Sequence, residues 1–155
     1  MSIVDDIAGL RRILTRYRSI AVVGISANWY RPSYFAAKYM QDHGYRIFPV
    51  NPNYTEVLGR KCYPTIAAIP EAIDIVDCFR KPDEMVPLAR EAVAKRAKVL
   101  WMQLGIRNEE AAEIASEAGL EVVMNHCVKI EHARILGGLN WAGVNTGVIS
   151  ARRPV

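Results

Sequence analysis

The sequence lacks long apolar runs, closely spaced cysteines and blocks of like charge. Cys62, Cys78 and Cys127 are far apart and form no C-x-x-C pattern, which favours reduced thiols over disulfides or a zinc site. Charged residues such as Asp5 and Asp6 interrupt the apolar positions near the start, so neither a signal peptide nor a membrane-spanning helix is predicted. We therefore expect a cytoplasmic protein with no metal and no membrane partner.

The composition is that of an ordinary folded domain. The 155 residues are 51% hydrophobic and 23% charged, so neither disorder nor a disulfide scaffold is indicated. The net charge is +4, but the basic residues are scattered and no nucleic-acid-reading motif is present, so we expect no nucleic-acid partner. A phosphorylated small molecule fits this charge. One domain over residues 1–155 is predicted, with its core at about 19–136.

Short apolar segments alternate with segments of helical spacing. Strands are predicted from continuous apolar runs at 20–23, 45–50, 73–79, 99–103 and 121–124. Helices are predicted at about 5–17, 33–43, 83–96, 108–118 and 128–136. This order is typical of an α/β fold, here a Rossmann-like, doubly wound parallel sheet of about five strands with helices on both faces and an extra N-terminal helix.

Glycine and proline suggest where the strands end. Gly24 closes the first run, whereas Pro49 and Pro52 cannot donate to a sheet, so the chain is expected to leave the sheet there. Residues 51–64 are predicted to form a loop, and residues 65–69 a short helical turn. The tail, 137–155, has no strong period.

In a parallel α/β sheet, ligands bind beyond the carboxyl ends of the strands, which draws attention to the turns there. The G-x-G-x-x-G pattern of dinucleotide sites is absent, because Ser26 and Trp29 stand where its second and third glycines would be. The second strand ends at Asn51 and not at an acid, so no carboxylate is available for a ribose diol. NAD is therefore disfavoured.

Five short motifs fall at these turns in a characteristic order. They are VVGIS at 22–26, RPS at 31–33, PVNP at 49–52, FRKP at 79–82 and WMQLGI at 101–106. With them the sequence resembles the CoA-binding protein family, Rossmann-like domains related to the CoA-binding domain of the succinyl-CoA synthetase α subunit. The resemblance runs from about Ser19 to about Leu136 and implies coenzyme A, or an acyl-CoA, as the ligand.

The resemblance implies that the backbone around Gly24, Ser26 and Ala27 cradles the CoA phosphates, with Arg31 and Ser33 nearby. Short side chains and a helix start suit such a cradle, because they let backbone N–H groups approach an anion. The other contacts that the resemblance implies are the adenosine side at Asn51 and Pro52, adenine and phosphate at Phe79, Arg80, Lys81 and Pro82, and the pantetheine path at Gln103 and Ile106.

Catalytic residues are not evident in the sequence. Relatives that cleave or ligate CoA thioesters use a phosphorylated histidine in a further domain, which these residues do not supply. His126 and Cys127 are adjacent, and neighbouring side chains in an extended segment point to opposite faces. His43 and His132 fit structural or exposed positions.

We therefore expect a CoA-binding protein without catalysis of its own. The alternative is a small enzyme acting on a CoA thioester or another nucleotide-containing substrate. Cys127 is expected near the ligand rim, either as a partner of the CoA thiol or as an inert thiol. The acyl group, a homodimer and a protein partner stay open.

Overall fold

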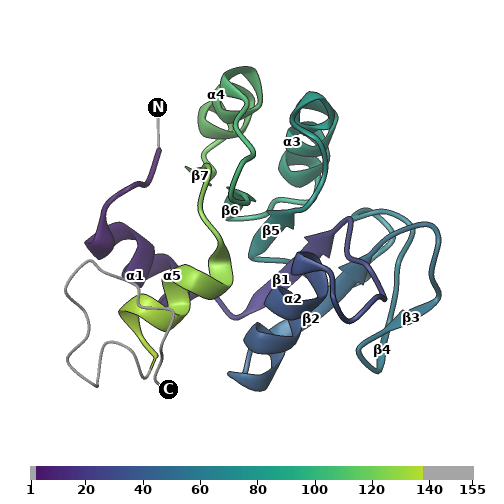
Figure 1. Cartoon of the computed structure of the whole chain (residues 1–155). Helices are drawn as coiled ribbons and strands as arrows, with labels where there is room; N and C mark the ends of the chain where they lie inside the picture. Colours follow the sequence, from purple (N-terminus) through teal and green to yellow (C-terminus); the bar gives the residue numbers. More distant parts are fainter. Residues whose placement is uncertain (1–2, 138–155) are drawn as a thin grey trace.

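A computed structural model describes residues 3–137 of the chain, and a five-stranded parallel sheet lies at its centre (Figure 1). The strands are β1 (Ser19–Val23), β2 (Arg46–Val50), β5 (Ile75–Cys78), β6 (Val99–Met102) and β7 (Glu121–Val123). They pair in the order β2-β1-β5-β6-β7, and every neighbouring pair is parallel. The predicted doubly wound α/β fold is confirmed. The expected tail lies, apart from its first residue, outside the described residues.

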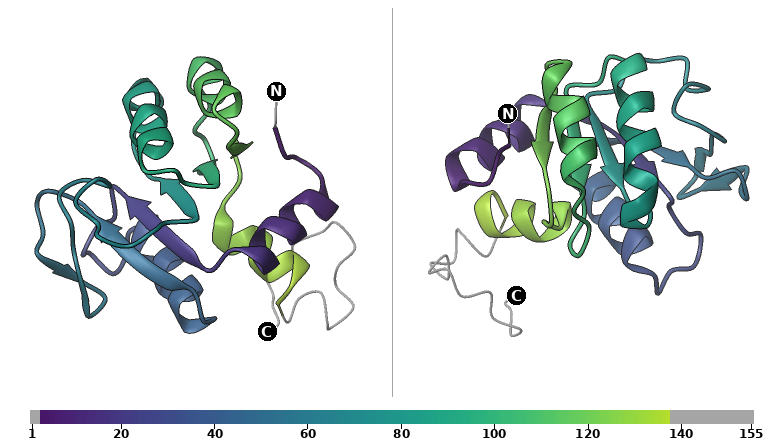
Figure 2. Two further views of the ribbon diagram at one scale, coloured as in Figure 1. Left: turned by 180° about the vertical axis from the view of Figure 1, so that it is seen from behind. Right: turned by 90° about the horizontal axis from the view of Figure 1, so that it is seen from above.

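Helices cover both faces of this sheet (Figures 1 and 2). One face carries α1 (Ile7–Arg16), α2 (Pro32–Asp42) and α5 (Val128–Ile135). The other carries α3 (Met85–Ala94), which follows a 3-10 turn at Pro82–Glu84, and α4 (Glu109–Glu117). Within residues 3–137, no helix is long and apolar enough to cross a bilayer.

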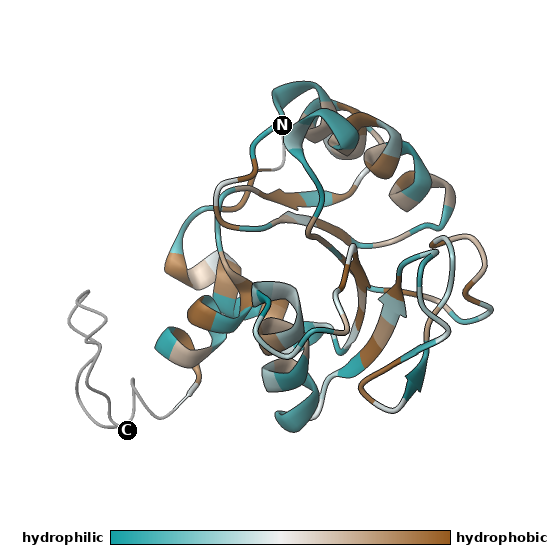
Figure 3. Cartoon of the chain, turned by 45° about the vertical axis from the view of Figure 1, so that its right-hand side comes forward, coloured by the Kyte–Doolittle hydropathy of each residue, from teal (hydrophilic) through white to brown (hydrophobic). Residues whose placement is uncertain are grey.

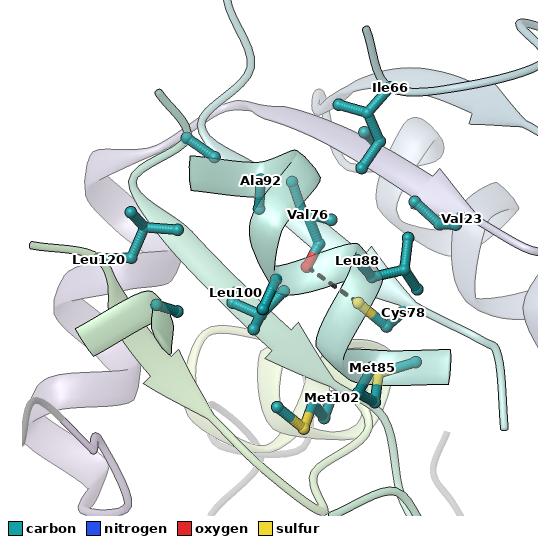
Figure 4. Packing of buried hydrophobic residues seen from close by; sticks show 14 of the residues in the cluster. Val23, Ile66, Val76, Cys78, Met85, Leu88, Ala92, Leu100, Met102 and Leu120 are labelled. Atoms are coloured by element: carbon teal, nitrogen blue, oxygen red, sulfur yellow. Dashed lines mark hydrogen bonds between the residues drawn. The ribbon is translucent and has the colours of Figure 1, made fainter. Parts of the chain in front are cut away.

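Both faces of the sheet are apolar because each strand is buried along most of its length. In β1, Ala21 and Val23 pack toward α3 and α4, while Ile20 and Val22 pack toward α1, α2 and α5. Figure 4 shows the α3 side of this core, and Figure 3 shows the hydropathy of the elements. Burial on two faces explains why these strands have continuous apolar runs instead of alternating ones.

Both edges of the sheet are partly covered by backbone. At β7, Ile3 forms a parallel bridge with Val122, and the Val4 N–H donates to the Val122 carbonyl at 2.8 Å. At β2, the Tyr63 N–H donates to the Pro49 carbonyl at 2.9 Å. β2 ends at Val50, between Pro49 and Pro52, so the predicted exit from the sheet is confirmed. Pro49 itself is tolerated within the strand because β2 is an edge strand.

The N-terminal helix is shorter than the predicted 5–17. Asp6 is its N-cap, and the carboxylate accepts a hydrogen bond from the Gly9 N–H at 3.1 Å. The acidic residues therefore precede the first turn. The Arg12 guanidinium pairs with the Glu121 carboxylate at the start of β7, which ties α1 to the sheet.

The predicted loop 51–64 contains a small antiparallel hairpin of β3 (Glu56–Val57) and β4 (Arg60–Lys61). Its turn has positive φ angles at Leu58 (58°) and Gly59 (72°). Two-residue strands are too short to show an alternating pattern, so the sequence did not reveal them. Residues 65–69 form hydrogen-bonded turns, not a helix.

A single carboxyl group is buried in the middle of the sheet. Asp77 in β5 is 1% exposed, and its carboxyl accepts a hydrogen bond from the Gln103 side-chain amide. Burial raises the pKa of Asp77 from 3.8 to about 8, although the bond from Gln103 acts in the opposite direction. Asp77 is therefore neutral in the folded protein at neutral pH.

This burial predicts a pH-dependent stability difference between the protein and Asp77→Asn. Between about pH 4 and pH 8 the folded state keeps a proton that the unfolded state releases, so Asp77 lowers stability as pH rises, by about 1.4 kcal/mol for each pH unit. Asp77→Asn keeps an acceptor for Gln103 and has no such slope. Urea unfolding at several pH values should show the variant gaining stability relative to the wild type toward pH 8. Parallel profiles would contradict a neutral, buried carboxyl.

A cluster of aromatic side chains joins α2 to α5. The His132 ring is 7% exposed, and its Nδ1 lies 2.9 Å from the Tyr39 hydroxyl. Its ring also contacts the rings of His43 and Tyr45. Burial above all, and then the positive charges of His43 and Arg18, lower the pKa of His132 to about 4. His132 is thus structural, and His43 is exposed, as the sequence indicated.

Acid should weaken this α2–α5 contact. Between pH 6.5 and about 4 the unfolded state takes up a proton that folded His132 refuses, so its contribution falls as pH drops through that window. His132→Gln should remove this slope. Exposed Lys98→Gln is the control, because Lys98 is not among the residues that contact His132 or shift its pKa. Because Asp77 has the opposite slope over the same range, the test compares each variant with the wild type at each pH. Equal effects of the two variants would refute it.

Candidate functional site

The strand order reverses at β1. The chain passes from β1 to β2 on one side and then crosses back to β5 on the other side. The turn after β1 leads to α2 on one face and the turn after β5 leads to α3 on the other, so the chain diverges beyond these two turns. A reversal of this kind is where ligands bind in an open α/β sheet. The motifs VVGIS, RPS and FRKP lie at these two turns.

The turn after β1 requires glycine. Gly24 has φ +87°, and a Cβ placed on it would lie 2.5 Å from the Phe79 carbonyl oxygen. Its N–H donates to the Val50 carbonyl at 2.9 Å. Gly24 therefore lets the turn after β1 lie directly against the backbone that follows β5.

Two serines shape the loop between Gly24 and α2. The Ser26 N–H donates to the Ser33 hydroxyl at 2.9 Å, and the Ser26 hydroxyl accepts from the Asn28 N–H at 3.0 Å. Pro32 occupies the first turn of α2, where its missing N–H costs nothing. The loop therefore folds back on the start of α2. The N-terminus of α2, which attracts anions, faces the carboxyl edge of the sheet.

Asn51 has a bracing role. Its side-chain amide donates to the Ile25 carbonyl at 2.8 Å and accepts from the Asn53 N–H at 2.9 Å. The turn after β2 is thereby tied to the turn after β1. Both ends of the amide have partners within the chain.

A small cavity of about 200 Å³ lies at the start of α2. It is lined by the predicted phosphate-cradle residues Gly24, Ser26, Arg31 and Ser33, together with Pro32 and Phe79. Backbone, hydroxyl and guanidinium groups therefore gather in a space suited to an anion.

A larger cavity of about 590 Å³ adjoins the small one, because both are lined by Pro32 and Phe79. It contains all of the predicted residues of the FRKP turn and the pantetheine path. Its full lining is Pro32, Phe79, Arg80, Lys81, Pro82, Gln103, Leu104, Ile106, Cys127 and Ile130. A cavity of this size falls in the usual range for small-molecule sites.

A third cavity, of about 240 Å³, lies on the α3 side of the edge. Its walls include Val23, Val50 and Leu88, and Arg80 lines both this cavity and the large one. The Arg80 guanidinium lies 3.9 Å from the Glu84 carboxylate. Arg80 therefore stands where the two faces of the sheet meet.

Ten of the thirteen predicted site residues line the small or the large cavity. Ala27, Asn51 and Pro52 line none of the three cavities. Sequence reasoning did not assign Pro32, Leu104 and Ile130, or the third cavity. Leu104 and Pro32 lie within the motifs WMQLGI and RPS, so those motifs held a signal for them, whereas Ile130 follows from helix packing alone.

Cys127 and His126 point to different surroundings. Cys127 lines the large cavity, and burial raises the pKa of its thiol. The two ring nitrogens of His126 contact the Asp5 and Glu131 carboxylates, at 2.7 and 3.3 Å. Both nitrogens are thus engaged away from the thiol, and the residues do not form a thiol–imidazole pair. Within the described part of the chain, no group of three or more His, Cys, Asp or Glu side chains is arranged so that it could hold a metal ion.

Three comparisons relate the chain to known proteins. The protein YneT of Bacillus subtilis is 42% identical over 126 residues, which cover 81% of this chain and 93% of that protein. A solved structure from Pyrococcus horikoshii has 47% identity and a TM-score of 0.84, covering 86% of this chain and 94% of the other. ADP-forming acetate–CoA ligase II of Archaeoglobus fulgidus is 30% identical over 129 residues, which cover 79% of this chain and 19% of the ligase.

The sequence pattern of a known domain also matches most of this chain. The CoA binding domain family matches residues 18–133, a range that includes every strand of the parallel sheet and all three cavities. The resemblance inferred from the five motifs is therefore confirmed, and the chain belongs to the CoA binding domain family.

Proposed function

We propose that this chain binds coenzyme A across the carboxyl edge of its sheet, without chemistry of its own. The observation that carries the proposal is the chain of adjoining cavities at the β1–β5 reversal. The three cavities meet at the ends of β1 and β5. Gly24 and Phe79 line the small cavity, their neighbours Val23 and Arg80 line the third, and the large cavity is lined by both Phe79 and Arg80. An elongated ligand whose charged middle lies in the small cavity can therefore place its two ends in the other two.

The phosphates are assigned to the small cavity. Gly24 allows close approach of the backbone, Ser26 and Ser33 provide hydroxyl groups, and Arg31 provides a positive charge. The start of α2 adds a partial positive charge. Ala27 lines none of the three cavities, so its place in this assignment comes from the sequence resemblance alone.

The two ends of the ligand are assigned to the other cavities. The third cavity combines apolar walls at Val23, Val50 and Leu88 with polar groups of Thr65, Glu84 and Glu91. It therefore suits a flat base with polar edges better than the predicted Asn51–Pro52 turn does. The pantetheine arm is assigned to the large cavity, along Gln103 and Ile106. Gln103 donates one N–H to Asp77, so its side-chain oxygen and its second N–H are left for an amide of the ligand.

Coenzyme A is preferred to NAD on the evidence of Asn51. This residue directly follows β2, where an acid would accept bonds from the ribose diol of NAD. Its amide instead braces Ile25 and Asn53. Arg80 and Lys81 at the edge suit a ribose that carries a phosphate.

Calorimetric titration with CoA, dephospho-CoA, NAD and ATP tests the proposal. CoA should bind most tightly, and Arg80→Ala or Lys81→Ala should weaken it roughly ten- to a hundredfold, because each removes a charge-assisted hydrogen bond. Dephospho-CoA should bind the wild type more weakly, and the variants should lose most of that discrimination.

Exposed Lys98 provides the control, because it directly precedes β6 at the amino ends of the strands, away from the cavities. Lys98→Ala should leave the CoA affinity unchanged. Unchanged affinity in both the Arg80 and the Lys81 variants would remove this turn from the site. Preference for NAD or ATP over CoA would overturn the ligand. Consumption of an added acyl-CoA would favour an enzyme.

A further inference from the structure

The two cavities that share Phe79 differ in chemistry. Polar or charged groups of Ser26, Arg31 and Ser33 border the small one. The large one has almost three times the volume, and its walls are mainly apolar. The apolar side chains are Pro32, Phe79, Pro82, Leu104, Ile106 and Ile130.

The large cavity has two charged side chains and one amide side chain in its lining, those of Arg80, Lys81 and Gln103. Arg80 and Lys81 belong to the turn after β5, next to the phosphate region. Gln103 is 3% exposed and is held by Asp77. Leu104 and Ile130 also line this cavity, and their side chains offer no polar group to a ligand amide.

Leu104 and Ile130 are also unusually open to solvent for residues of an apolar cavity. They are 64% and 38% exposed and come from different elements, the turn after β6 and the first turn of α5. A hydrocarbon chain lying between them would remove their surface from water, which is favourable in proportion to the area covered. A thiol alone would cover little of that surface.

We infer that the large cavity takes the hydrocarbon chain of an acyl thioester, so that the ligand class is apolar acyl-CoA in preference to free CoA. This inference rests on the proposed function, since it assumes that the phosphates lie in the small cavity. The Leu104–Ile130 wall is the part of the site that distinguishes the two ligands.

Cys127 is compatible with a bound thioester. Its thiol lines the same cavity, and burial raises its pKa, so it stays protonated at neutral pH. The thiolate, not the thiol, attacks a thioester. The cavity therefore holds an acyl-CoA beside a cysteine without transferring the acyl group to it.

Calorimetric titration of the whole chain with CoA, acetyl-CoA, butyryl-CoA and hexanoyl-CoA tests the inference. Each methylene that becomes buried should tighten binding by about three- to fourfold, until the cavity is full. Equal or weaker binding of hexanoyl-CoA relative to CoA would overturn the inference and leave the proposed function standing. If none of the four ligands binds, both fall.

Variants locate the effect. Leu104→Ser and Ile130→Ser change exposed side chains, so folding should persist, and each should reduce the hexanoyl-CoA to CoA affinity ratio by about threefold or more. Ile7→Ser is the matched control, because Ile7 is 52% exposed in the first turn of α1 and lines none of the three cavities. An equal drop in the ratio for Ile7→Ser, or no drop for the other two, would contradict this wall.

Discussion

The close approach of two backbone segments at Gly24 is the constraint on which the carboxyl edge of the sheet and its cavities depend. The turn after β1 lies against the Phe79 carbonyl, at a distance that leaves no room for a side chain, and its φ of +87° is one that other residues rarely adopt. This contact makes Phe79 a shared wall of the small and the large cavity. A backbone contact thus sets the position of the candidate site, and the lining side chains are arranged around it.

Different residues of the turn after β5 line the cavities on the two faces of the sheet. Phe79 lines the cavities beside the starts of α2 and α5, whereas Arg80 also lines the cavity beside α3. A ligand that crosses the edge therefore passes Arg80. Behind the edge, Asp77 stays neutral because it is buried, and it holds the amide of Gln103 without adding a negative charge near the proposed phosphate site.

The sequence predicted the features that repeat along the chain. Continuous apolar runs gave all five parallel strands, because strands buried on both faces leave that pattern. It did not predict the β3–β4 hairpin, whose strands have two residues each. The exit from the sheet near Pro49 and Pro52 was predicted correctly, because proline cannot donate to a sheet and β2 ends at Val50.

The sequence likewise predicted some features of the candidate site and not others. Motif residues next to strand ends, such as Gly24 and Arg80, lie at cavities because topology brings those ends together. Asn51 was given a ligand role, but its amide braces neighbouring turns, which only coordinates reveal. Ile130 lies in a helix far along the chain, and the sequence carried no sign that its first turn closes the large cavity.

The central claim is that coenzyme A occupies the carboxyl edge at the β1–β5 reversal. It is tested most directly by NMR titration of the ¹⁵N-labelled chain with CoA, following the backbone amide signals. The account predicts that the signals of Ser26, Arg80 and Gln103 shift, whereas those of Gly44 and Gly119, which precede β2 and β7 at the opposite edge, stay in place. Shifts confined to that opposite edge, or no shifts at saturating CoA, would contradict it.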